Sequence, residues 1–219
     1  MTVKVKICGL TTAETVTAAV TAGACYIGFV FFDKSPRNIS PQRAGKLAEL
    51  IPGNIIKCGV LVNPANDELD DILAHIPLDL IQLHGGESPA RTKEIRDHFG
   101  LPVMKAIAVA GPKDIALAKT YENMVDMVLF DAKPPPALKE ALPGGNGLAF
   151  DWQLIKGADL ALPWMLSGGL ETDNLAQAIA TSGAKMVDVS SGIEDHPGEK
   201  NITRINAFLR QARMLNEDG

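Results

Sequence analysis

One unit, a short apolar segment followed by a segment with helical spacing, repeats along all 219 residues of the chain. Eight of the apolar segments have the length of strands. A new strand begins roughly every 23 residues, as in repeated βα units. The predicted strands cover residues 3–7, 26–32, 55–62, 78–83, 101–109, 127–130, 162–166 and 185–189. Helical periodicity predicts helices over residues 12–21, 40–50, 66–75, 88–98, 112–119, 172–181 and 202–214.

Eight parallel βα units in one chain predict a (β/α)8 TIM barrel, folded as one domain over residues 1–219. The segment 26–32 is almost continuously apolar, which is typical of a parallel strand covered on both faces. The alternative, a doubly wound open sheet, would leave two edge strands unpaired. Neither the first nor the last predicted strand carries the proline or dense charge that often protects an edge, and this favours the closed barrel.

The overall charge limits the ligands that the chain can bind. A net charge of −5 gives no basic surface for nucleic acid or for an anionic membrane. No apolar run approaches the length of a membrane span, and we expect no secretion signal. The three cysteines do not form a disulfide framework, so we expect a cytoplasmic protein. We also expect no metal site, because no Cys-x-x-Cys or paired-His spacing is present.

In a (β/α)8 barrel the active site lies at the carboxyl ends of the strands, so the residues there are the candidates for chemistry. Cys8 ends the first predicted strand, where a thiol is either a catalytic group or a small buried hydrophobe. A general base must be a thiolate, which a nearby cation favours. Lys6, on the same strand face as Cys8, and Arg37, in the second loop, are the candidate cations.

Three further side chains with acid–base chemistry lie at predicted strand ends. Asp131 follows apolar residues of the sixth strand, so its carboxyl can keep a proton and act as a general acid, although an aspartate there can also cap the next segment. His84 ends the fourth strand and either lines the substrate or binds a metal with Asp131 and Asp188. Only one histidine ends a strand, which favours substrate binding. Asp188 is a further candidate for substrate binding, and it either orients the first loop or pairs with a lysine of a neighbouring strand.

Glycine clusters after the last two strands predict a phosphate site. Ser167, Gly168 and Gly169 follow the seventh strand, and Ser191 and Gly192 follow the eighth. Glycine lets backbone N–H groups approach an anion, and these two loops form the usual phosphate site of this architecture. Three glycines of the long sixth loop can add further amides: Gly144, Gly145 and Gly147. We therefore expect a barrel of the phosphate-binding type, whose partner is a small phosphorylated substrate.

Taken together, these motifs resemble the phosphoribosylanthranilate isomerase family of tryptophan biosynthesis. The resemblance covers nearly the whole chain, with its motifs in the family's order. It lies in Val5-Lys6-Ile7-Cys8-Gly9, Gly28-Phe29-Val30-Phe31, Ser35-Pro36-Arg37, Gln82-Leu83-His84-Gly85, Phe130-Asp131, Gly144-Gly145-Asn146-Gly147, Phe150-Asp151-Trp152, Leu166-Ser167-Gly168-Gly169 and Val187-Asp188-Val189-Ser190-Ser191-Gly192.

The resemblance implies an Amadori rearrangement of N-(5-phosphoribosyl)anthranilate to 1-(2-carboxyphenylamino)-1-deoxyribulose 5-phosphate. It implies that Cys8 is the general base and Asp131 the general acid, and that Arg37 lies near the anthranilate carboxylate. Neither a metal nor another cofactor is needed, because one acid and one base suffice. The backbone amides that would hold the phosphate lie around Gly145, Gly168, Gly169 and Gly192.

The chain departs from the family pattern in the sixth loop. Relatives commonly carry a basic residue soon after the third glycine of this loop, whereas Gly147 is followed here by Leu148 and Ala149. We therefore expect backbone amides to bind the phosphate without that side chain. The sequence leaves the oligomeric state open between a monomer and a homodimer.

Other phosphate-binding barrels are the competing interpretations. An indoleglycerol-phosphate synthase would carry a lysine and glutamate pair in its early strands, which this chain lacks. The sugar isomerase of the histidine pathway would carry an aspartate in place of Cys8. A non-catalytic barrel that senses phosphate would be expected to show no turnover.

Overall fold

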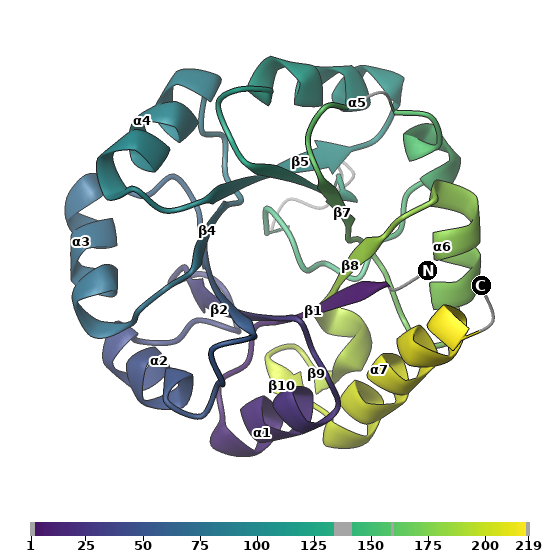
Figure 1. Ribbon diagram of the computed structural model, residues 1–219, viewed down its shortest axis with the longest axis horizontal. Helices are drawn as coiled ribbons and strands as arrows, with labels where there is room; N and C mark the ends of the chain where they lie inside the picture. Colours follow the sequence, from purple (N-terminus) through teal and green to yellow (C-terminus); the bar gives the residue numbers. More distant parts are fainter. Residues whose placement is uncertain (1–2, 134–141, 159, 218–219) are drawn as a thin grey trace.

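The computed structural model describes residues 3–133, 142–158 and 160–217. Eight parallel strands close into a barrel in sequence order, and β1 pairs with both β2 and β8 (Figure 1). The predicted (β/α)8 barrel is therefore confirmed. Its strands are β1 (Lys4–Cys8), β2 (Tyr26–Phe31), β3 (Ile56–Leu61), β4 (Leu80–Leu83), β5 (Val103–Val109), β6 (Met127–Ala132), β7 (Trp164–Leu166) and β8 (Met186–Val189).

Helices surround the barrel on its outside (Figure 1). Thr12, Ser40 and Ser88 cap the first, second and fourth of them by accepting a hydrogen bond from the backbone N–H three residues later. None of the helices in the described part of the chain has the length and apolar character needed to cross a membrane. The helices are α1 (Ala13–Thr21), α2 (Pro41–Ala48), α3 (Asn66–His75), α4 (Pro89–Phe99), α5 (Pro112–Ala118), α6 (Leu175–Ser182) and α7 (Ile202–Glu217), with 3₁₀ turns η1 (Lys119–Tyr121), η2 (Trp152–Ile155) and η3 (Ser191–Ile193).

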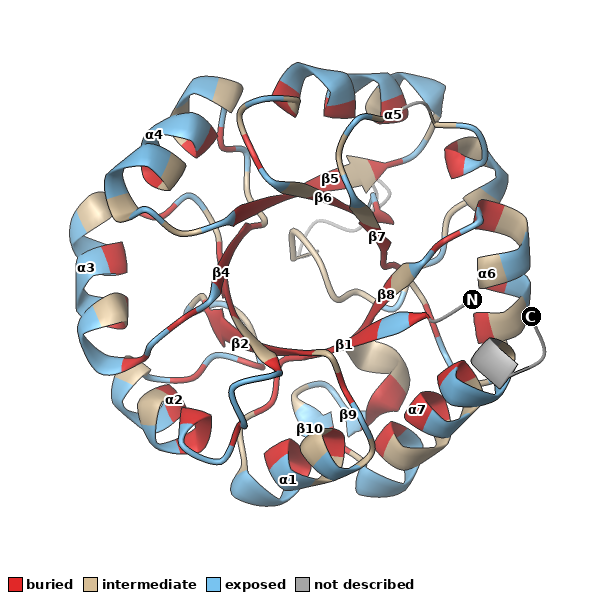
Figure 2. Ribbon diagram, in the orientation of Figure 1, coloured by how far each residue is buried: buried red, intermediate tan, exposed pale blue. Residues whose placement is uncertain are grey.

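The barrel wall separates two apolar clusters. Outward-facing side chains such as Ile7 and Phe29 pack under the helices, whereas Met104 and Leu129 lie in the inner cluster. The strands are buried along most of their length, while the outer faces of the helices are exposed (Figure 2). Because side chains alternate along β1, Cys8 belongs to the inner cluster although its neighbour belongs to the outer one.

The other two cysteines also belong to the inner side of the barrel. Cys58 is fully buried, and Cys25 is half-buried against the same cluster. Burial raises the pKa of Cys58 to about 12, so this thiol stays protonated at neutral pH. Among the described residues no disulfide is present, and all three thiols are free.

Apart from shifts of one or two residues at element ends, two differences from the sequence prediction stand out. A hairpin of β9 (Glu194–His196) and β10 (Glu199–Lys200) follows η3, where no strand was predicted. Its strands are too short and too polar to show an apolar alternation. The sixth α-helix begins at Leu175 instead of residue 172, because the Asn174 side chain donates to the Gly169 carbonyl and holds a turn before the helix.

The packing of α2 on α3 predicts an unusual effect of a glycine substitution. Gly45→Ala in α2 would normally stabilise a helix, but its Cβ atom would lie 2.3 Å from the His75 carbonyl oxygen. We expect the free energy of unfolding to fall by about 1–3 kcal/mol in urea titrations. Gly53→Ala is the matched control, because nothing lies within 4 Å of the added atom. Equal stability of the two variants would contradict the packing described here.

Candidate active site

The predicted site residues converge on one cavity at the carboxyl ends of the barrel strands. Val30 of β2 and Val60 of β3 contribute apolar side chains to its wall. The predicted site residues that line the cavity come from six of the eight barrel units. Of the predicted residues, all except Gly192 line it: Cys8, Arg37, His84, Asp131, Gly144, Gly145, Gly147, Ser167, Gly168, Gly169, Asp188 and Ser191.

Strand β1 positions Cys8, and its neighbour on β2 is Gly28, which has no side chain. The strand register pairs Cys8 with Gly28. A Cβ atom at Gly28 would lie 2.9 Å from Sγ of Cys8 and 3.1 Å from Nζ of Lys6. Gly28 therefore leaves the space in which the thiol and the ammonium group lie close together.

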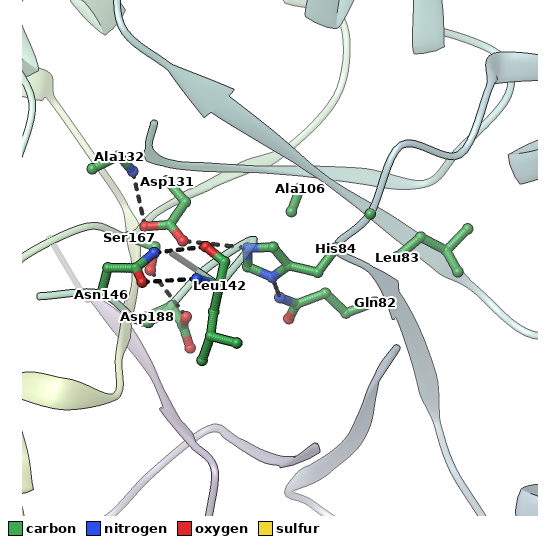
Figure 3. A network of polar contacts seen from close by, with 12 residues as sticks. Gln82, Leu83, His84, Ala106, Asp131, Ala132, Leu142, Asn146, Ser167 and Asp188 are labelled. Atoms are coloured by element: carbon green, nitrogen blue, oxygen red, sulfur yellow. Dashed lines mark hydrogen bonds and ion pairs between the residues drawn. The ribbon is translucent and has the colours of Figure 1, made fainter. Parts of the chain in front are cut away.

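Lys6 is fully buried and is paired with the last strand of the barrel. Its Nζ donates a hydrogen bond to Oδ1 of Asp188 at 2.9 Å. The second carboxylate oxygen of Asp188 accepts a hydrogen bond from Oγ of Ser167 at 3.1 Å (Figure 3). Of the two alternatives for Asp188, the structure shows the pairing with a lysine of a neighbouring strand, because β8 lies beside β1. A contact of Asp188 with the substrate stays a prediction.

The electrostatic surroundings of Cys8 act in opposite directions. Burial raises the pKa of the thiol, and the ammonium group of Lys6 lowers it, leaving it above its ordinary value. Burial also acts to lower the pKa of Lys6, but the Asp188 carboxylate and the two buried thiols raise it above its ordinary range. Lys6 therefore stays charged and is the nearby cation that favours a thiolate at Cys8.

Asp131 is held at both carboxylate oxygens (Figure 3). Oδ1 accepts from the backbone N–H of Ala132 at 2.9 Å, and Oδ2 lies 3.2 Å from Nε2 of His84. The Gln82 amide donates from its Nε2 to Nδ1 of His84 at 2.8 Å. Since Nδ1 accepts, the neutral imidazole carries its proton on Nε2 and donates it to Asp131. The contacts from Gln82 through His84 thus fix the orientation of the carboxyl group.

Arg37 lies in the second loop and lines the cavity, and other residues of the protein bind part of its guanidinium group. Nε and Nη2 donate to the two carboxylate oxygens of Glu194, each at 2.7 Å, and Nη2 also donates to the Gly145 carbonyl at 3.2 Å. Nζ of Lys200 donates to the same carboxylate at 2.6 Å. Sequence reasoning missed Glu194 and Lys200, because they lie in a polar segment with the composition of a surface turn.

The predicted glycine loops bring the backbone close to the site residues. Gly168 and Gly145 have φ angles of +87° and +73°, in the left-handed region that favours glycine. A Cβ atom at Gly168 would lie 2.8 Å from a backbone nitrogen of β6, and one at Gly145 would lie 2.5 Å from Nη1 of Arg37. Gly192 lies outside the cavity wall and packs against the Leu170 carbonyl. Its contact with a phosphate stays a prediction.

The alternative of a metal bound by His84, Asp131 and Asp188 required these three side chains to converge. The structure brings His84 to Asp131, but it directs Asp188 to Lys6 and Ser167. In the described ranges no three His, Cys, Asp or Glu side chains form a group that could hold a metal ion.

The barrel and the residues gathered at its carboxyl-terminal end define the class of the protein, a (β/α)8-barrel enzyme. The family model for N-(5'-phosphoribosyl)anthranilate isomerase matches residues 5–211. The chain belongs to this family, whose members are isomerases of tryptophan biosynthesis.

Relatives and solved structures agree with this assignment. The N-(5'-phosphoribosyl)anthranilate isomerase of Paracoccus denitrificans is 53% identical over 213 residues, which cover 97% of this chain and 98% of that protein. The crystal structure of the Thermotoga maritima phosphoribosyl anthranilate isomerase is 34% identical, with a TM-score of 0.86 and coverage of 97% and 99%. A phosphoribosyl anthranilate isomerase in complex with reduced 1-(o-carboxyphenylamino)-1-deoxyribulose 5-phosphate is 32% identical, with a TM-score of 0.82 and the same coverage.

The contact between Lys6 and Cys8 predicts how readily the thiol reacts. Lys6→Met removes the cation that lowers the pKa of Cys8 and leaves the Asp188 carboxylate, which raises it. We expect alkylation of Cys8 by iodoacetamide at pH 8, followed by mass spectrometry of the Cys8 peptide, to slow by about tenfold for each unit of pKa. Lys4→Met is the control, because Lys4 is exposed on the same strand. An unchanged rate in Lys6→Met would contradict the assigned role of Lys6.

Proposed function

We propose that the protein converts N-(5-phosphoribosyl)anthranilate to 1-(2-carboxyphenylamino)-1-deoxyribulose 5-phosphate by an Amadori rearrangement. The observation that carries the proposal is that Cys8 and Asp131, from β1 and β6, open into one cavity. The site thus offers a base and an acid to one bound sugar. A relative's complex with the reduced product supports the choice of substrate.

Asp131 acts first, as the general acid. In its protonated form it gives its proton to the ribose ring oxygen while the bond from that oxygen to C1′ breaks. The lone pair of the anthranilate nitrogen forms the new bond to C1′, which gives an open-chain Schiff base. The contacts of Asp131 with His84 and Ala132 support this role, because they hold the carboxyl group in one orientation.

Cys8 acts second, as the general base. Its thiolate removes the proton from C2′, and the electron pair moves to form an enolamine, which tautomerises to the 1-deoxyribulose ketone. The Lys6 ammonium group stabilises the thiolate before this transfer. Each step moves a proton between the enzyme and the substrate or an electron pair within the substrate, so the proposed reaction uses neither a metal nor an organic cofactor.

The two charged ends of the substrate hold the sugar between the acid and the base. Backbone N–H groups of the loops after β6, β7 and β8 bind the phosphate, and Arg37 binds the anthranilate carboxylate. In the proposed complex Leu148 contributes no charge to the phosphate site, so backbone amides and the neighbouring hydroxyl groups supply its hydrogen bonds. Binding at both ends aligns C1′ and C2′ with the catalytic groups.

Two substitutions test this proposal. Cys8→Ser and Asp131→Asn should each lower kcat by about 10²- to 10⁴-fold, because each removes a general base or acid. The loss of anthranilate fluorescence measures turnover, and calorimetry with the reduced product analogue should show binding close to wild type. Cys25→Ser is the control, because Cys25 does not line the cavity. Full activity of either variant removes that residue from its role, and no turnover by the wild type overturns the function.

A further inference from the structure

We propose that Glu194 is a positioning residue that makes the site selective for substrates with a carboxylate. It holds the Arg37 guanidinium group so that Nη1 is presented to the cavity. The inference rests on the proposed function, because it concerns the residue that would bind the anthranilate carboxylate. It assigns a role to the β9–β10 hairpin, which otherwise has none in the chemistry.

The two contacts from Arg37 to Glu194 fix the plane of the guanidinium group. Nε and Nη2 each donate to a different carboxylate oxygen at 2.7 Å, which is the bidentate geometry that arginine and carboxylate prefer. The two side chains are only 6% and 4% exposed, so water does not compete strongly for them. This geometry leaves the guanidinium group no freedom to rotate about its own axis.

The same contacts leave one nitrogen available for a ligand. Nη2 uses its hydrogens on Glu194 and on the Gly145 carbonyl. Nη1 donates to none of the described residues, although it lies beside Gly145 and Arg37 lines the cavity. Its two N–H groups are therefore the part of Arg37 that can bind a carboxylate oxygen of the substrate.

The charges around Glu194 favour an anion at this end of the cavity. The buried cluster contains one carboxylate between two cations, Arg37 and Lys200. Burial raises the pKa of Glu194, but the contacts with Arg37 and Lys200 lower it further, so the pKa stays below its ordinary value. Burial lowers the pKa of Lys200 to about 8, so the Lys200 side chain is still mostly protonated at pH 7. The cluster thus carries excess positive charge, which a substrate carboxylate would balance.

Lys200 connects this cluster to the end of the strand that carries the thiol. Its Nζ donates to the Ser190 carbonyl at 2.9 Å and lies 3.0 Å from Oγ of the same residue. Oγ of Ser190 in turn donates to the Cys8 carbonyl at 3.2 Å. The hairpin therefore sets the position of Arg37 relative to Cys8, which is what a positioning role requires.

Glu194→Gln tests the role with two matched ligands. The ligands are the reduced product analogue with its carboxyl group and the corresponding phenylamino deoxyribitol phosphate without it. Glutamine keeps the shape of glutamate, but its amide nitrogen cannot accept from Nη2. By calorimetry we expect the variant to bind the carboxylated ligand about tenfold or more weakly, and the other ligand within about twofold of wild type. In turnover, KM should rise while kcat changes little.

Asp195→Asn is the control, because this neighbouring hairpin carboxylate is exposed and contacts Asn201 and Arg204 instead of Arg37. It should bind both ligands as the wild type does. If Glu194→Gln does not fold, Glu194→Asp replaces it with the same expectation, since the side chain keeps its charge but is one methylene too short to hold Arg37 in the same position.

The outcomes separate this inference from the proposed function. A selective loss for the carboxylated ligand supports the inference. An equal loss for both ligands, or no loss, overturns it while wild-type turnover of phosphoribosylanthranilate still stands. If the wild type neither turns over that substrate nor prefers the carboxylated ligand, the proposed function fails and the inference fails with it.

Discussion

The ion pair between Lys6 and Asp188 joins the first strand of the barrel to the last, and the candidate site depends on it. The two residues lie opposite each other in the register that closes the barrel. Both are buried, so removing one partner would leave a buried charge without compensation, at a cost of about 3–5 kcal/mol. The barrel therefore closes in a register that also places an ammonium group beside Cys8.

The same principle, a buried cation with its own carboxylate, recurs at Arg37. Arg37 is bound by Glu194 as Lys6 is bound by Asp188. In each pair the carboxylate fixes a cation: Lys6 lies beside the thiol of Cys8, and Arg37 would bind the substrate carboxylate in the proposed complex. Asp131 differs, because hydrogen bonds from His84 and from a backbone amide hold it. The site thus combines two fixed cations with the carboxyl group that we propose as the proton donor.

Much of this arrangement could be predicted from local sequence. The spacing of apolar segments predicts the barrel, and the barrel places strand-end residues such as Cys8 and Asp131 at one end. The pairing of Glu194 with Arg37 could not be predicted, because 157 residues separate them and the hairpin shows no strand pattern. Nor could the tautomer of His84, since it depends on which atom of Gln82 faces the ring. Sequence periodicity does not predict contacts between units that are far apart along the chain.

A crystal structure with the reduced product analogue bound tests the central claim most directly. We expect Sγ of Cys8 and the carboxyl group of Asp131 to contact the sugar chain from different sides. The phosphate should accept hydrogen bonds from backbone N–H groups around Gly168, and the aromatic carboxylate should lie on Nη1 of Arg37. A complex in which the sugar carbons lie out of reach of Cys8, or in which the phosphate lies away from these loops, would contradict the account.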